Sequence, residues 1–325
     1  MEKILVTGGA GYIGSNVVNM LVNMGLDAQI FIVDNLSTGH RKSLNPKAKF
    51  FKVNLTDFKA LRDVFKKIKP DVVFHFGGVS QVGESNKKPK KYIKNNVIGG
   101  LSLLNSMAQF DCKKIIFSSS ASVYGNPKKI PITESHPLSP ISVYGETKVA
   151  FEKLLESFRK TYGIKYLSLR YFNAGGASEN NKYGEIHDPE THLIPTILKS
   201  IKKGSAFNVF GDDYKTNDGT CVRDYVHVID IAKAHVLGMK YLNKKTSSSE
   251  TINLGTGKGF SVKEILTACE KVTGKKIKVN ISERRKGDPA TLIASNSKAK
   301  KILDWKPEKT INDIVKSAWK FEKSK

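Results

Sequence analysis

The stretch 4-ILVTGGAGYIGSN-16 decides the fold of this 325-residue chain. An apolar run leads into a turn that contains Gly8, Gly11 and Gly14, and a segment with helical apolar spacing follows at once. Glycines at such a turn let a pyrophosphate approach bare backbone, and the helix N-terminus offers N–H groups to it. Gly9-x-Gly11-x-x-Gly14 also fits the dinucleotide-binding pattern, which is specific only in this strand-to-helix context. The stretch therefore predicts the nucleotide-binding turn of a parallel sheet.

The residues that follow repeat this alternation of strand and helix. Near-continuous apolar runs of this length indicate parallel strands buried on both faces, and the segments between them have apolar residues at helical spacing. Repeated alternation predicts an α/β fold with a Rossmann-type doubly wound parallel sheet. The predicted strands are 3–8, 28–34, 48–54, 71–76, 113–120 and 165–172.

Beyond about residue 174 the regular alternation breaks up, and glycine, asparagine and proline become frequent. We therefore expect a nucleotide-binding Rossmann domain over residues 1–173 and a smaller mixed α/β domain over residues 174–325. Segments of about 221–240 and 251–256 are expected to return to the first domain.

The composition excludes several classes of protein. The formal net charge is +24, from 54 Lys and Arg against 30 Asp and Glu, but the excess is spread as lysine pairs over loops and helix surfaces. We therefore predict no specific nucleic-acid partner. The N-terminus enters a strand without a signal sequence, and no apolar run has the length of a membrane span, so a cytoplasmic location without membrane attachment is expected.

Cysteine and histidine spacing predicts no metal. The three cysteines are scattered, and no Cys/His ligand spacing is present. His192, His227 and His235 are too dispersed along the chain for a cluster, and the acidic pair at 212–213 is weak evidence for one. His75 is interpreted as a packing residue at the end of a strand.

Asp34 ends the second predicted strand, 20 residues after Gly14. At this distance a carboxylate accepts hydrogen bonds from the ribose 2′-hydroxyl of NAD and repels the 2′-phosphate of NADP. Arg41 and Lys42 follow shortly after and weaken this preference without reversing it. The sequence therefore predicts NAD as the cofactor.

The chemistry is predicted from Tyr144 and Lys148, which share one face of a helix because residues i and i+4 are neighbours. Tyr124 has Lys128 at the same spacing, but prolines around that pair argue against a helix. An unperturbed tyrosine is a poor base, and a neighbouring ammonium and a nicotinamide cation would lower its pKa. The strand-end run 118-SSS-120 brings hydroxyl groups to the carboxyl edge of the sheet, where such folds bind ligands. We therefore predict Tyr144 as general base, with Lys148 and one of the three strand-end serines as its catalytic partners.

These residues resemble the extended short-chain dehydrogenase/reductase family, and the similarity extends along the whole chain. The stretches that carry it are VTGGAGYIGSN, VDNLSTG, FSSSASVYG, VYGETK, LRYFNAGGA, FGDDYKTNDGTCVRDYVHVID, NLGTGKGFSV and ERRKGDP. The segment 211–230 is the most specific, because it is typical of the branch that epimerises UDP-sugars. The resemblance implies NAD as cofactor, UDP-sugar as substrate and a homodimer formed through the helices at 92–109 and 146–161.

The resemblance also implies the residues that bind each ligand. Lys148 would hold the nicotinamide ribose, Ser120 would bridge the sugar O4 and Tyr144, and arginines would bind the diphosphate. The residues implied for NAD are Gly8, Gly11, Tyr12, Ile13, Gly14, Asp34, Asn35, Ser37, Gly39, Asn54, Leu55, Phe76, Gly77, Asn95, Ser118, Tyr144, Lys148 and Tyr171. Those implied for the UDP-sugar are Ser120, Tyr144, Asn173, His192, Asn208, Phe210, Arg223, Arg285, Asp288 and Leu292.

Three positions depart from the family pattern. Asn54 replaces an aspartate near adenine but still offers an acceptor, and Ser80 replaces a lysine found in some members near the cofactor. Leu292 is intermediate in size at a position that borders C2 of the sugar. Activity on UDP-GlcNAc and UDP-GalNAc therefore stays open.

The activity implied is the reversible interconversion of UDP-glucose and UDP-galactose through a 4-keto intermediate. An epimerase of UDP-glucuronate is the closest alternative. A nucleotide-sugar dehydratase is less favoured, because Ala121 and Ser122 stand where that chemistry uses an Asp-Glu pair. A catalytically inactive polyanion-binding protein is supported only by the net charge.

Overall fold

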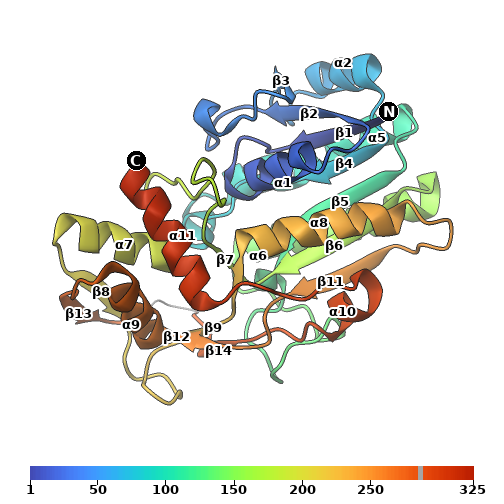
Figure 1. Cartoon of the computed structure of the whole chain (residues 1–325). Helices are drawn as coiled ribbons and strands as arrows, with labels where there is room; N and C mark the ends of the chain where they lie inside the picture. Colours follow the sequence, from blue (N-terminus) through green and yellow to red (C-terminus); the bar gives the residue numbers. More distant parts are fainter. Residues whose placement is uncertain (285–287) are drawn as a thin grey trace.

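A parallel sheet forms the centre of the molecule. The computed structural model describes residues 1–284 and 288–325. The strands of this sheet are β1 (Glu2–Thr7), β2 (Ala28–Asp34), β3 (Lys49–Lys52), β4 (Val72–His75), β5 (Lys114–Ser120), β6 (Lys165–Tyr171) and β11 (Glu250–Leu254). They follow the order β11-β6-β5-β4-β1-β2-β3 (Figure 1), and neighbouring strands are parallel. The predicted doubly wound sheet is confirmed, with all of its predicted strands.

Helices cover both faces of this sheet. One face carries α1 (Tyr12–Asn23), α8 (Val228–Leu242) and α10 (Ser297–Leu303), and the other carries α2 (Phe58–Ile68), α5 (Gly99–Gln109) and α6 (Val143–Tyr162). Successive residues of a strand point to opposite faces, so Ile4 and Val6 pack toward α1 while Leu5 packs toward α2 and α5. Burial on both faces explains why these strands are apolar throughout.

Short helical segments connect several strands. They are η1 (Arg41–Ser43), α3 (Val82–Lys87), α4 (Pro89–Tyr92), η2 (Ile93–Ile98) and η3 (Ala121–Val123). The η2 segment is a π-helix, and its buried Asn96 donates to Val79 O at 3.0 Å and to Thr147 Oγ1 at 3.0 Å. These hydrogen bonds tie the loop after β4 to α6.

The second half of the chain forms small sheets around a separate apolar core. Its strands are β7 (Asn173–Gly175), β8 (Phe207–Phe210), β9 (Val222–Arg223), β10 (Tyr225–His227), β12 (Phe260–Ser261), β13 (Val279–Ser282) and β14 (Thr291–Leu292). They pair as β10-β7, β12-β9-β14 and β13-β8. The core is shared by α7 (Leu193–Lys203), α9 (Val262–Thr273) and α11 (Ile311–Ser324), which lie together at one end of the molecule (Figure 1).

The segments expected to return to the first domain lie in different parts of the fold. Strand β11 forms the edge of the parallel sheet beside β6, and α8 packs against α1. Residues 222–223 form β9, which pairs with β12 and β14 in a small sheet. The domain boundary at residue 173 itself stays a prediction.

Among the described residues, no helix has both the length and the apolar character that are needed to span a bilayer.

Candidate active site

The glycines of the turn after β1 allow a close approach of neighbouring backbone segments. Gly8 has φ +71°, and a Cβ there would lie 2.6 Å from Gly77 N, while a Cβ at Gly14 would lie 2.3 Å from Gly8 O. Helix α1 starts at Gly11 without a side-chain cap and has no acidic residue in its first turn. The first N–H groups of α1 therefore face an anion-binding position, as the sequence predicts.

Asp34 stands at the carboxyl end of β2 and is 8% exposed. Its Oδ2 accepts a hydrogen bond from Ala10 N at 3.0 Å, and its Oδ1 accepts one from Leu36 N at 2.8 Å. Burial raises the pKa of Asp34, and these two backbone hydrogen bonds partly offset that increase. The carboxylate is thus fixed beside the glycine turn, where a ribose hydroxyl would donate to it.

The three predicted catalytic residues come together from β5 and α6. Ser142 caps α6 through Gly145 N, so Tyr144 lies in the first turn of the helix. Tyr144 is 8% exposed and is hydrogen-bonded to Ser120 at the end of β5. Lys148 Nζ lies 5.5 Å from the centroid of the Tyr144 ring. The arrangement places a phenol, a hydroxyl and an ammonium at one strand end.

The pKa of Tyr144 differs from the sequence expectation. Burial raises it to about 12, although the hydrogen bond from Ser120 lowers it. Burial also lowers the pKa of Lys148 to about 8, which Glu152 partly offsets. The expectation counted two cations, Lys148 and a nicotinamide ring; in the chain alone, where Lys148 Nζ donates to Ser118 O at 2.7 Å, desolvation of the phenol dominates.

A buried ion pair that the sequence analysis did not find supports this site. Glu152 lies one turn after Lys148 on α6, and Arg170 Nη2 on β6 donates to its Oε2 at 2.5 Å. Ser119 Oγ donates to Glu152 Oε1 at 2.7 Å, and Arg170 Nη1 donates to Tyr124 Oη at 2.9 Å. Tyr124 follows a short 3-10 turn, which confirms that it shares no α-helical face with Lys128. The network fixes the spacing between β5 and α6.

One large cavity runs from the glycine turn past Ser120 to the loop before α7. Gly39 is absent from its wall, since a Cβ there would lie 2.9 Å from the Cβ of Ala10 and its role is close packing. His75 is also absent, and its imidazole is buried between Phe117 and Phe151, as expected of a packing residue. The other residues predicted for the cofactor line the cavity: Gly8, Gly11, Tyr12, Ile13, Gly14, Asp34, Asn35, Ser37, Asn54, Leu55, Phe76, Gly77, Asn95, Ser118, Tyr144, Lys148 and Tyr171.

The residues predicted for the substrate divide into three groups. Ser120, Tyr144, Asn173, His192 and Leu292 line the cavity. Arg285 lies outside the described residues. The following predicted residues are described but are not part of the cavity wall: Asn208, Phe210, Arg223 and Asp288.

Arg223 and Asp288 form an ion pair in the region of the small sheets. Arg223 Nη2 donates to Asp288 Oδ1 at 2.6 Å, and Arg223 Nη1 donates to Val222 O at 2.8 Å. The next residue, Asp224, is fully buried and accepts hydrogen bonds from Thr256 N at 2.8 Å and Ala294 N at 3.2 Å. Asp224 thereby holds the β9 and β14 segments in place around this ion pair.

The sequence analysis also missed the surroundings of His192. Glu185, His187 and Glu190 lie around it, and one side-chain nitrogen or oxygen from each of the four residues falls within 4.8 Å of the others. Burial lowers the pKa of His192, but the two carboxylates outweigh burial and bring it to about 10. The stretch 185-EIHDPETH-192 carries the residue types but has no regular structure, so its spacing does not reveal the cluster.

Known proteins are similar to this chain along nearly its whole length. The family model described as GDP-mannose 4,6 dehydratase matches residues 5–318. The curated UDP-glucose 4-epimerase of Lactobacillus helveticus is 50% identical over 99% of this chain and 97% of its own length. The crystal structure of UDP-glucose 4-epimerase from Bifidobacterium longum in complex with NAD⁺ and UDP has a TM-score of 0.93 and 38% identity, covering 99% of this chain and 98% of that chain. The UDP-Glc/GlcNAc 4-epimerase from Campylobacter jejuni has a TM-score of 0.86 and 37% identity, covering both chains fully.

Proposed function

Because the chain belongs to the UDP-glucose 4-epimerases of the extended short-chain dehydrogenase/reductase family, we propose that it interconverts UDP-glucose and UDP-galactose. The reaction is an oxidation and re-reduction at C4 of the sugar through a 4-keto intermediate. The observation that carries this proposal is the convergence of Ser120, Tyr144 and Lys148 in the cavity that starts at the glycine turn.

The residues of the cavity fit NAD as the cofactor. Gly8, Gly11 and Gly14 line the cavity without side chains, so that a pyrophosphate would meet bare backbone, and Asp34 would accept a hydrogen bond from the adenosine ribose. Lys148 on α6, whose Nζ donates to Ser118 O of β5 at 2.7 Å, would hold the nicotinamide ribose. When bound, NAD accepts a hydride from C4 of the sugar and later returns it.

Tyr144 is the proposed general base. Its phenol takes the proton from O4 during oxidation and gives it back during reduction, and Ser120 holds O4 in reach of the phenol. The phenol pKa of about 12 in the chain makes it a poor base at neutral pH. A cation beside the ring would lower that pKa, since charge favours the phenolate.

The UDP part of the substrate must stay bound while the sugar rotates. We propose that Arg223 binds the diphosphate and Asp288 the nucleoside part, so that the flat 4-ketose rotates about its link to the diphosphate. Binding energy is then provided by groups that do not react. Asn208, Phe210 and Arg285 complete this proposed UDP subsite.

The alternative of a dehydratase lacks an acid at the required place. Ala121 and Ser122 follow Ser120 at the cavity wall, and the carboxylates among the described lining residues are Asp34 and Glu185. Asp34 accepts backbone hydrogen bonds next to the glycine turn, and Glu185 belongs to the cluster around His192. Epimerisation, which needs one acid/base residue, is therefore favoured.

Specificity, location and assembly are further parts of the proposal. Leu292 lines the cavity, and its intermediate size is compatible with slow turnover of N-acetylated UDP-sugars. The enzyme acts in the cytoplasm in galactose metabolism and forms a homodimer through η2, α5 and α6. Ile93 and Ile98, which are 47% and 43% exposed on this surface, support the dimer.

The function is tested by incubating the purified protein with UDP-galactose and, separately, with UDP-GalNAc, without added nucleotide. We expect UDP-glucose from the first substrate and slower formation of UDP-GlcNAc from the second. Chromatography of the products measures both. Absence of UDP-glucose, both without and with added NAD⁺, would overturn the proposal.

A further inference from the structure

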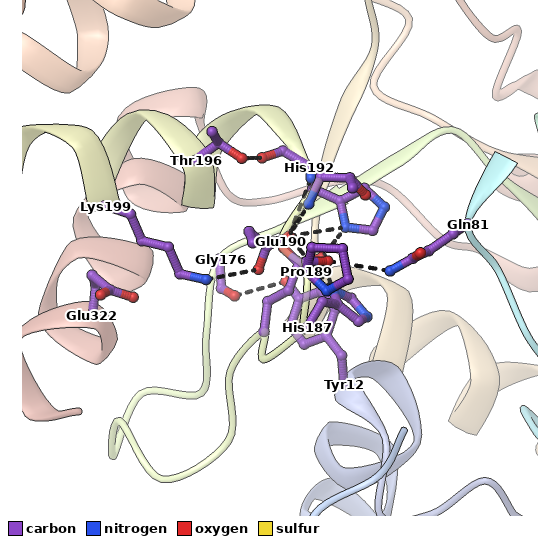
Figure 2. A network of polar contacts seen from close by, with 12 residues as sticks. Tyr12, Gln81, Gly176, His187, Pro189, Glu190, His192, Thr196, Lys199 and Glu322 are labelled. Carbon is purple, nitrogen blue, oxygen red and sulfur yellow. Dashed lines mark hydrogen bonds and ion pairs between the residues drawn. The ribbon is translucent and has the colours of Figure 1, made fainter. Parts of the chain in front are cut away.

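The loop before α7 gathers four ligand-type side chains that take no part in the proposed proton transfer, although the resemblance also implies His192 for the substrate. Figure 2 shows His187, Glu190 and His192 converging, with Lys199 on the outer side of Glu190. The side chains of Glu185 and Glu190 are only 7% and 4% exposed. Two carboxylates buried side by side require positive charge between or beside them.

The two imidazole nitrogens are oriented toward a point among the carboxylates. His187 Nδ1 and His192 Nδ1 are buried, and within the described residues neither has a hydrogen-bond partner of acceptable geometry. Carboxylate oxygens nevertheless lie close: His187 Nδ1 is 3.3 Å from Glu185 Oε1, and both Nδ1 atoms are 3.6 Å from Glu190 Oε1. Imidazole nitrogens that are close to oxygens, but not aligned with them as hydrogen bonds, suit a shared cation that displaces their protons on binding.

Most of the separations between imidazole nitrogens and carboxylate oxygens are those of ligands around one ion. Four ligands at 2.0–2.2 Å from a tetrahedral zinc ion lie about 3.3–3.6 Å from one another. Three of the four separations between imidazole nitrogens and carboxylate oxygens fall in that range. The fourth, from His192 Nδ1 to Glu185 Oε1, is 2.5 Å and must lengthen by about 1 Å to fit.

We propose that Glu185, His187, Glu190 and His192 form a binding site for a divalent transition-metal ion of the zinc class. Imidazole nitrogen together with carboxylate oxygen is a donor set that suits zinc and its neighbours better than calcium or magnesium. Because the protein supplies all four ligands, the ion has a structural role and takes no part in the proton transfer by Tyr144. The proposal departs from the sequence expectation of no metal.

The ion would stabilise the loop of residues 185–192, which forms one side of the cavity. Glu185, His187 and His192 line the cavity, and Pro189 O in the same loop accepts from Gln81 Nε2 at 3.2 Å (Figure 2). Tyr12 in the glycine turn donates to Gly176 O at 2.7 Å, beside the same cluster. Metal binding therefore stabilises the wall between α1 and α7.

Zinc binding to the full chain, purified without a polyhistidine tag and treated with a chelator, tests this proposal. We expect one equivalent of Zn²⁺ by elemental analysis and competition with a chromophoric chelator, and a rise in the melting temperature on adding Zn²⁺. His187→Gln and Glu190→Gln should each weaken binding at least about tenfold, because loss of even an outer-shell partner costs that much.

Matched controls are available away from the cluster. Glu179 is an exposed glutamate before the loop, and His136 lies in the segment between η3 and α6. Glu179→Gln and His136→Gln should bind Zn²⁺ as the unmodified chain does. Equal Zn²⁺ affinity in the cluster variants and the controls would overturn the proposal.

A spectroscopic measurement covers the case in which the cluster variants fail to fold. Co²⁺ added to the unmodified chain should give the visible absorption of tetrahedral Co²⁺, and Zn²⁺ should displace it. Only the weak absorption of hydrated Co²⁺, or no zinc bound at all, would show that the cluster is an ion-pair network without a metal.

Discussion

The carboxyl ends of the parallel strands, called the sheet edge below, and the region of small sheets build their parts of the site in different ways. At the sheet edge, Asp34, Ser120 and Tyr171 each end a strand, and the regular order of β2, β5 and β6 brings those ends together. In the small sheets, Arg223 and Asp288 come from segments 65 residues apart and meet only because β9 pairs with β14. The first arrangement follows from a repeated pattern, and the second depends on individual long-range contacts.

This difference suggests a division of labour. The sheet edge carries the groups proposed to react, in a rigid frame fixed by the Glu152–Arg170 ion pair. The small sheets carry the groups proposed to bind and select the substrate, which can vary without disturbing the parallel sheet. Substitutions at the sheet edge should therefore change kcat or the free energy of unfolding, whereas substitutions in the small sheets should change KM or substrate specificity.

The largest effect is expected at the sheet edge from Tyr144→Phe. Loss of the general base should lower kcat for UDP-galactose by about 10²- to 10⁴-fold, while the NAD content is kept. The control is Tyr162→Phe at the far end of α6, where the ring is 48% exposed. Near-normal turnover of Tyr144→Phe, measured by product formation, would show that the sheet edge does not supply the base.

Lys148→Met separates function from stability at the same edge. With a folded pKa of about 8 and an ordinary value of 10.5, the buried ammonium destabilises the fold below about pH 8. Between about pH 8 and 10.5 the unfolded state binds more protons, so the free energy of unfolding of the unmodified protein rises with pH. At pH 7 the substitution should raise that free energy by up to about 3 kcal/mol, with a gain that shrinks toward pH 10.5, and should abolish activity.

Urea unfolding of nucleotide-free protein at pH 7 and pH 10 measures this effect. Lys153→Met is the control, since Lys153 is exposed on the same helix. If Lys148→Met proved less stable than the unmodified protein at pH 7, the hydrogen bond to Ser118 would outweigh the cost of burying the charge.

Arg223→Ala tests the binding role of the small sheets. Loss of one partner of a buried, hydrogen-bonded charge pair should raise KM for UDP-galactose by about 30-fold, and kcat should change little. Arg159→Ala, at an exposed ion pair on α6, serves as the control. A fall in kcat with an unchanged KM would place Arg223 among the reacting groups and remove the proposed division.

Leu292→Ala should have the smallest effect. Shortening this side chain should enlarge the cavity. We therefore expect the ratio of kcat/KM for UDP-GalNAc to kcat/KM for UDP-galactose to rise by about tenfold, the lower end of the effect of one methylene group in a pocket. Leu138→Ala removes a surface leucine as the control. An unchanged ratio would show that Leu292 does not border the N-acetyl group.

The sequence predicted the sheet edge far better than the loops. The glycine turn, Asp34 and the Ser120–Tyr144–Lys148 group are all found in the cavity wall, because strand and helix periodicity fixes where such residues lie. The rise in the Tyr144 pKa was not predicted, because the extent of burial depends on packing against Val79 and Tyr92. The Glu152–Arg170 pair was missed for the same reason.

The sequence alone determined the class of fold, the cofactor turn and the residues of the proposed chemistry, because these depend on local spacing along strands and helices. Only the tertiary structure decided that Arg223 pairs with Asp288, that Gly39 packs against Ala10, and that three other side chains of an irregular loop converge near His192. The physical reason is that contacts between distant or irregular segments have no period, so their geometry is set by the packing of the whole chain.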